Sequence, residues 1–99
     1  MSKVFDVGPQ SVRVVGGPVS FYEHYQTTML YEERVFGGSV ATVTISNDSE
    51  TDTIYLSYDG ATVDGSLSKK ESITLNVDNL SGIYIRGDVG GGYVRIWGW

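Results

Sequence analysis

The chain has 99 residues, enough for one domain with a small hydrophobic core, because globular domains most often contain about 100–150 residues. Seven basic and twelve acidic side chains give a net charge of −5. An acidic chain repels phosphate groups, so we expect no nucleic-acid partner and no membrane partner. Cysteine is absent, which excludes disulfides, thiolate catalysis and zinc sites built on sulfur.

The N-terminal third, residues 1–36, has the less regular pattern and is a candidate partner-contacting segment. Three short strands are predicted there, separated by glycine and proline: residues 4–7, 11–15 and 19–25. The stretch from Thr27 to Phe36 favours an extended strand through its threonine, tyrosine and valine content. Its alternation is mixed, however, and Met29–Arg34 could equally form one or two helical turns.

The rest of the chain, residues 39–99, alternates apolar and polar residues with period two, which is typical of strands that bury one face. Five segments share this pattern: residues 39–47, 53–58, 72–77, 82–86 and 93–99. In the first of them the alternation places Ala41 on the buried side and Val40 on the opposite side. The predicted core consists of Val43, Ile45, Ile54, Leu56, Ile73, Leu75, Val77, Ile83, Ile85, Val94 and Ile96.

Turn residues separate these strands at short intervals. Asn47–Asp52 is predicted to be a polar hairpin loop, residues 78–82 a second turn, and Gly87–Gly92 a glycine-rich connection. A short extended piece, Ala61–Val63, is expected between two Asp-Gly turns. The scarcity of strong helix formers agrees with this pattern. We therefore predict a single all-β domain over residues 1–99, an antiparallel β-sandwich or jelly roll.

Residues that could carry chemistry are few. His24 is the only histidine, and no Gly-x-Ser-x-Gly motif accompanies it. Asp48, Glu50 and Asp52 have the spacing of some calcium ligands, but Thr53 and Asp59 stand where such a loop needs Gly and Glu, so a polar hairpin tip is the favoured interpretation. We predict no catalytic residue, cofactor or metal site, and no enzymatic activity.

The face opposite the aliphatic core carries an unexpected set of side chains. Both tryptophans and several tyrosines fall on it beside arginine, and these residue types are enriched at binding hot spots. Coverage by the N-terminal third is the competing interpretation. The predicted partner or oligomer interface consists of Tyr55, Tyr84, Tyr93, Arg95, Trp97 and Trp99.

The same strands carry a resemblance to known proteins. The chain reads Val-Thr-Ile-Ser-Asn from Val43, Ile-Tyr-Leu-Ser-Tyr-Asp-Gly from Ile54, Ser-Ile-Thr-Leu-Asn-Val-Asp-Asn-Leu from Ser72, Ile-Tyr-Ile-Arg-Gly from Ile83 and Val-Arg-Ile-Trp-Gly-Trp from Val94. This resembles the small β-sandwich structural proteins of tailed bacteriophages, which commonly close with an apolar strand ending in Trp. The resemblance covers just over half of the chain. In such proteins the Asn after the first strand and the Tyr-x-Ser-x-Asp-Gly stretch belong to the scaffold.

The resemblance implies a virion component, assembled in the host cytoplasm, and most specifically a capsid decoration (cement) protein that binds and stabilises the capsid surface. Its expected partners are the major capsid protein or other virion proteins, together with further copies of itself, a trimer being favoured. A place in the tail, neck or head fibre is an alternative. A second alternative is a carbohydrate-binding module that stacks sugars on its aromatic side chains.

Overall fold

The computed structural model describes the backbone of residues 3–7, 10–14 and 21–99, and the side chains of residues 21–38, 40–76 and 80–99. Across the described residues the fold is all-β, as predicted, and no stretch is helical. The strands are β1 (Lys3–Val7), β2 (Gln10–Val14), β3 (Phe21–Gln26), β4 (Glu32–Asn47), β5 (Ile54–Ser57), β6 (Gly65–Leu67), β7 (Ser72–Gly87) and β8 (Tyr93–Gly98). In the part of the chain described, no helix is long and apolar enough to cross a membrane.

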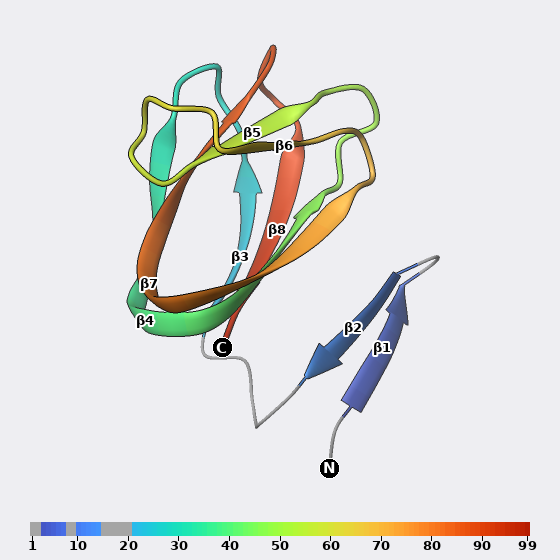
Figure 1. Cartoon of the computed structure of the whole chain (residues 1–99). Coiled ribbons are helices and arrows are strands. Elements are labelled where there is room, and N and C mark those ends of the chain that lie inside the picture. Colours follow the sequence, from blue (N-terminus) through green and yellow to red (C-terminus); the bar gives the residue numbers. More distant parts are fainter. Residues whose placement is uncertain (1–2, 8–9, 15–20) are drawn as a thin grey trace.

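These strands form two antiparallel sheets (Figure 1). β1 and β2 make a two-stranded sheet in which Phe5 lies opposite Val12. The other six strands make one sheet in the order β3-β8-β4-β7-β5-β6. Strands that are distant in the sequence, such as β3 and β8, therefore lie side by side.

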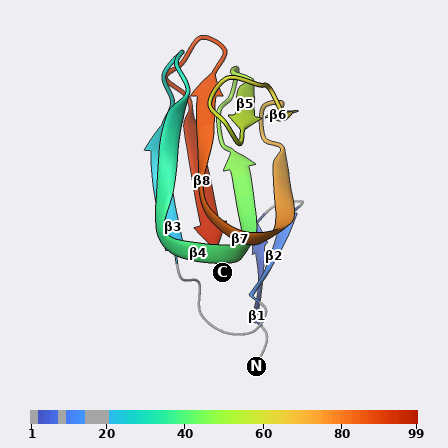
Figure 2. The ribbon, with the colours of Figure 1, turned by 60° about the vertical axis from the view of Figure 1, so that its left-hand side comes forward.

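The two long strands, β4 and β7, pair along two different stretches. The first part of β4, from Glu32, pairs with the second part of β7, and the second part of β4, up to Ser46, pairs with the start of β7. One end of this ribbon continues into β8 and β3, and the other end continues into β5 and β6. Both strands curve sharply between these stretches (Figures 1 and 2), so the sheet turns back on itself around the core.

Glycines and a register shift mark the bend. The pairing of β4 with β7 is irregular between Val35 and Thr42, where Gly37 has a φ of +77°. Across the ribbon, a Cβ on Gly82 would lie 3.0 Å from the main-chain oxygen of Arg34, so the close approach needs glycine there. The predicted turn at residues 78–82 is therefore wrong, because β7 runs through it as one strand.

The core lies between the two halves of the folded sheet. Eight of the predicted core side chains are buried: Val43, Ile45, Ile54, Leu56, Ile83, Ile85, Val94 and Ile96. Leu75 is partly buried against them, and the side chain of Val77 lies outside the described part. Ile73 was predicted to be buried but is 37% exposed, because no further strand pairs beyond the first part of β7 among the described residues.

Three further expectations need correction. Val40 is buried and Ala41 exposed, the reverse of the prediction, because the irregularity between Val40 and Thr42 shifts the alternation by one residue. Strand structure in the ambiguous stretch begins only at Glu32, and none of that stretch is helical. The short extended piece expected at Ala61–Val63 is not a strand. The strand in this region is β6, Gly65–Leu67, because Gly65 pairs with Leu56 of β5.

Candidate functional site

The six residues predicted to form an interface lie on the outer side of the folded sheet, but on two separate surfaces. Along β8, Val94 and Ile96 point into the core, so the alternate residues of that strand face outward. Tyr93, Arg95, Trp97 and Trp99 follow this outward alternation. Tyr55 and Tyr84 belong to β5 and the second part of β7, in the other half of the sheet.

Aromatic side chains of β3 and β8 pair across the two strands. Tyr22 lies opposite Trp97 in the register, and their ring centroids are 5.6 Å apart. His24 and Tyr93 form a second pair at 4.8 Å. Tyr22 and Tyr93 are about half exposed, with 53% and 45% of their surfaces accessible. These four residues and Arg95 are called the β3–β8 aromatic surface.

Arg95 is held in one orientation within this surface. Its Nε donates to Asp48 Oδ2 at 2.5 Å and its Nη2 donates to Oδ1 of the same carboxylate at 3.1 Å. The guanidinium carbon also lies 5.1 Å from the ring centroid of Trp97. The hydrogen bond to Asp48 raises the pKa of Arg95, so the side chain stays charged. A fixed cation therefore sits between an acidic loop and an indole ring.

Trp99 differs from Trp97 in that its main chain is tied to β4. Its nitrogen donates to Thr42 at 2.9 Å, and its carbonyl oxygen accepts from the nitrogens of Ala41 and Thr42. Its Nε1 is buried and has no hydrogen-bond partner among the described residues. Both tryptophans are partly exposed, but Trp99 is anchored in the sheet with its indole nitrogen buried, whereas Trp97 belongs to the aromatic surface.

The second surface is centred on Arg86. Its guanidinium carbon lies 4.3 Å from the ring centroid of Tyr55 and 5.2 Å from that of Tyr31. Tyr84 packs beside this group over Gly60, where an added Cβ would lie 3.1 Å from the ring. All three tyrosines are half-buried, and these contacts fasten the 59–60 loop to the sheet. This surface resembles scaffold packing more than an open binding site.

The groups considered for chemistry are dispersed. The His24 ring packs against the Tyr93 ring, and among the described residues no serine or threonine hydroxyl is hydrogen-bonded to the imidazole. The three carboxylates of the 48–52 loop each have a different role: Asp48 binds Arg95, Glu50 pairs with Lys70 at 2.7 Å, and Asp52 turns inward. Among the residues described, no three of His, Asp and Glu gather in a way that could hold a metal ion.

The polar residues at the end of β4 form part of the scaffold. Asn47 is fully buried, and its amide Nδ2 donates to the carbonyl oxygens of Asp52, Leu67 and Ser68 at 2.9–3.1 Å. Its Oδ1 accepts from the nitrogen of Ser49. One buried amide therefore connects two loops to the sheet.

The Tyr-x-Ser-x-Asp-Gly stretch has a similar structural role. Ser57 is fully buried, and its Oγ accepts from the nitrogens of Asp59 and Gly60. The Asp59 carboxylate accepts from the nitrogens of Ala61 and Thr62 at 2.8 Å. These bonds, the one from Thr62 first, hold the pKa of Asp59 well below its usual range. The stretch is a tightly bonded turn.

Comparison with known protein families, curated proteins and solved structures finds no match to the chain. Function therefore has to be inferred from the chain's own residues. Tyr22 and His24 are the members of the aromatic surface that sequence reasoning missed. Their alternation in Phe21–Gln26 was visible, but their position beside Trp97 and Tyr93 depends on a pairing between the third and the last strand.

Proposed function

We propose that the chain is a structural protein of a virion, a capsid decoration or cement protein that binds the capsid through its β3–β8 aromatic surface. The observation that carries this proposal is the pairing of Tyr22 with Trp97 and of His24 with Tyr93 around the fixed cation of Arg95. Aromatic side chains and arginine are the types that dominate protein–protein binding energy. Because two strands and Asp48 hold them, little side-chain entropy is lost when a partner docks.

The wider architecture fits a part that binds and reinforces. We classify the two facing halves of the folded sheet as a β-sandwich, with the jelly roll as the nearest named type. Rigid sheets position exposed side chains well, and repeated copies on a symmetric shell convert modest contacts into high avidity. The partner would be the major capsid protein or another virion protein, with the decoration protein acting as an oligomer, a trimer being favoured.

Sedimentation of the purified chain with phage heads tests the proposal. The wild-type chain should pellet with heads from a phage that encodes it, and Trp97→Ala should reduce the bound fraction at least tenfold while the thermal melt stays cooperative. Leu30→Ala is the control, because Leu30 is an exposed apolar residue outside the β3–β8 aromatic surface. Equal pelleting of Trp97→Ala and wild type would contradict the proposal, as would a failure of wild type to bind.

A carbohydrate-binding module is the second candidate, and one observation favours it. The exposed Thr74 continues the outer face beyond Trp97: the buried Thr44 lies opposite Trp97, and its Oγ1 is 2.9 Å from that of Thr74. An indole beside hydroxyls is an arrangement that can stack a sugar ring and bind its polar groups. Quenching of Trp97 fluorescence by soluble oligosaccharides, absent in Thr74→Val, would favour this candidate over the first.

A further inference from the structure

The edges of the six-stranded sheet differ in how they are protected. Exposed edges normally carry charges, proline or very short strands, which prevent pairing with other chains. In the described sheet β3 contains Glu23 and His24, the first part of β4 reads Glu-Glu-Arg from Glu32, and β6 has three residues. The start of β7, Ser72–Asn76, has neither charge nor proline, and we call it the β7 edge.

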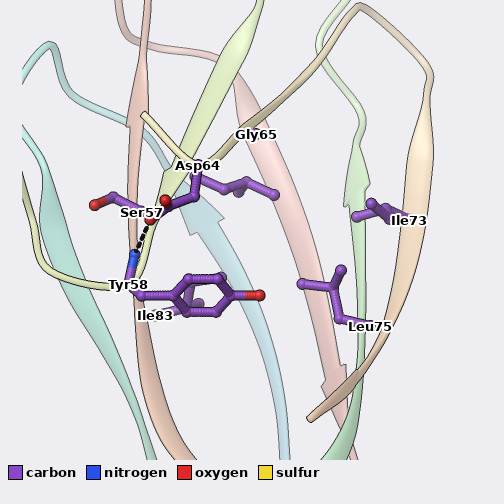
Figure 3. A pocket seen from close by; sticks show the side chains of 8 residues that line it. Ser57, Tyr58, Asp64, Gly65, Ile73, Leu75 and Ile83 are labelled. Atoms are coloured by element: carbon purple, nitrogen blue, oxygen red, sulfur yellow. Dashed lines mark hydrogen bonds between the residues drawn. The ribbon is translucent and has the colours of Figure 1, made fainter. Parts of the chain in front are cut away.

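An apolar groove opens beside the β7 edge (Figure 3). It has a volume of about 50 Å³, enough for one aliphatic side chain. Ile73 and Leu75 line it from the β7 edge, while Leu56 and Ile83 belong to the core behind it. Gly65, on the opposite side, comes from the edge strand β6. Backbone groups and an apolar hollow therefore lie next to each other.

The opposite side of the folded sheet is closed by polar contacts. The Tyr25 hydroxyl donates to Glu32, and Arg34 pairs with Glu23 at 3.3 Å. Arg34 also lies 4.2 Å from the ring centroid of Tyr25. These side chains bridge β3 and the first part of β4, which are not hydrogen-bonded neighbours in the sheet. On the side of the groove, in contrast, Ile73 and Leu75 border an apolar opening.

A strand with the right properties exists in the chain itself. β1 and β2 form a separate two-stranded sheet, and an isolated hairpin of this kind is marginally stable in water. Their sequences, KVFDV and QSVRV, are rich in valine, a side chain that the groove could hold. Residues 1–20 carry a net charge of +1 from Lys3, Asp6 and Arg13, which leaves −6 on the remainder. The hairpin and the rest of the chain therefore carry net charges of opposite sign, which favours their approach.

We propose that the β1–β2 hairpin of a neighbouring copy pairs with the β7 edge and places an aliphatic side chain in the groove. A strand added beyond β7 lies four strand spacings from β3, about 19 Å. The seven residue steps from Val14, where β2 ends, to Phe21, where β3 begins, span at most about 25 Å when fully extended, so a chain's own hairpin has little slack to reach this edge. The hairpin of another copy meets no such restriction. Resting on the proposed function, this pairing supplies the contact between copies on a capsid.

Light scattering behind a sizing column tests whether the β7 edge mediates association between copies. Wild type should form a concentration-dependent oligomer, and Ile73→Lys should remain a monomer over at least a tenfold higher concentration range, because the β7 edge then carries a charge. Val35→Lys is the matched control, since Val35 is an exposed aliphatic residue on the β4 edge, and it should associate like wild type. Unchanged association of Ile73→Lys, or a monomeric wild type at every concentration, would overturn the proposal.

Disulfide cross-linking identifies the strand that pairs with the β7 edge. Because the chain has no cysteine of its own, only the introduced cysteines can form a disulfide. Chains carrying Gln10→Cys or Ser11→Cys, which together sample both faces of β2, are mixed with Thr74→Cys chains and oxidised. A disulfide between the two kinds of chain is expected, and none with Val35→Cys. A third chain carries Thr74→Cys together with Ser11→Cys, and a disulfide within this chain without any between chains would assign the edge to its own hairpin and overturn the proposal. Head binding by Trp97→Ala tests the proposed function separately.

Discussion

Asn47 and Asp52 are hydrogen-bonded to each other across the loop that follows β4, and Asp52 also binds a second loop. The Asn47 amide donates to the main-chain oxygen of Asp52 at 2.9 Å, while the Asp52 carboxylate accepts from the nitrogens of Val89 and Gly90 at 3.1 Å. The loop after β4 is thereby joined to the loop between β7 and β8. The 48–52 stretch, whose spacing resembles that of calcium ligands, therefore connects two loops of the sheet through hydrogen bonds.

Replacing Asn47 by Asp should destabilise the fold severely. The substitution keeps the shape but turns a donor into an acceptor facing three carbonyl oxygens, and it buries a charge without a partner. We expect a loss of about 3 kcal/mol or more, measured by urea unfolding at pH 7. Asn76→Asp, at an exposed position, is the matched control and should change the unfolding free energy by less than about 0.5 kcal/mol. Similar losses in both variants would contradict the role assigned to Asn47.

Ile85→Asp should abolish cooperative unfolding, whereas Ile73→Asp should not. Ile85 is fully buried between the two halves of the sheet, and an unpaired carboxylate there costs several kcal/mol of a total stability that is typically about 5–15 kcal/mol. Ile73 lies at the edge and is 37% exposed, so its substitution should cost about 1 kcal/mol. Thermal melts followed by circular dichroism distinguish the two. A cooperative melt of Ile85→Asp would refute the core assignment.

Gly60→Ala should destabilise the protein more than Gly91→Ala. Both glycines have positive φ, +83° and +89°, so each alanine meets the same backbone strain of about 1–2 kcal/mol. Only at Gly60 would the new Cβ also press on the Tyr84 ring, since nothing lies within 4 Å at Gly91. We expect Gly60→Ala to cost about 1 kcal/mol more in chemical denaturation. Equal costs would show that the Tyr84 ring moves freely.

Asp59→Asn should lower stability at neutral pH and weaken its dependence on acid. The hydrogen bonds from Thr62 and Ala61 lower the pKa of Asp59 in the folded state, so its ionised form stabilises the fold. That contribution is complete above the unfolded pKa of about 3.9 and is lost as the pH falls toward the folded value. The melting temperatures of wild type and variant should therefore converge below pH 4. Asp88→Asn, at an exposed position, serves as the control and should follow wild type throughout.

Local alternation was enough to predict much of this fold. The alternation in β8 placed Val94 and Ile96 inside and Trp97 outside, as the structure has them. Glycine and asparagine between Val77 and Gly82 predicted a turn, yet Gly82 permits the close passage of β4 in a strand that continues. The same residue types thus serve turns and sharp bends, and local sequence does not separate the two.

The local sequence pattern could not predict which strands pair or which side chains a further strand covers. Ile73 has the alternation of a core residue, but its exposure depends on whether another strand lies beyond it. Tyr55 and Trp97 share the outer side of a continuous sheet, and the bend in β4 and β7 separates them into two surfaces. Alternation assigns a face to a residue, whereas a binding surface also depends on strand order and curvature.

The shared ribbon of β4 and β7 has a consequence for how the chain folds. Glu32 pairs with Ile85, and Ser46 pairs with Ser72, so both halves of the sheet depend on contacts between distant parts of the sequence. Such topologies fold slowly, because loop-closure entropy is lost before the contacts are gained. Neither half can persist after the ribbon opens. The amides of both strands should then exchange with solvent together, at the rate of global unfolding, so the domain gives way as one cooperative unit.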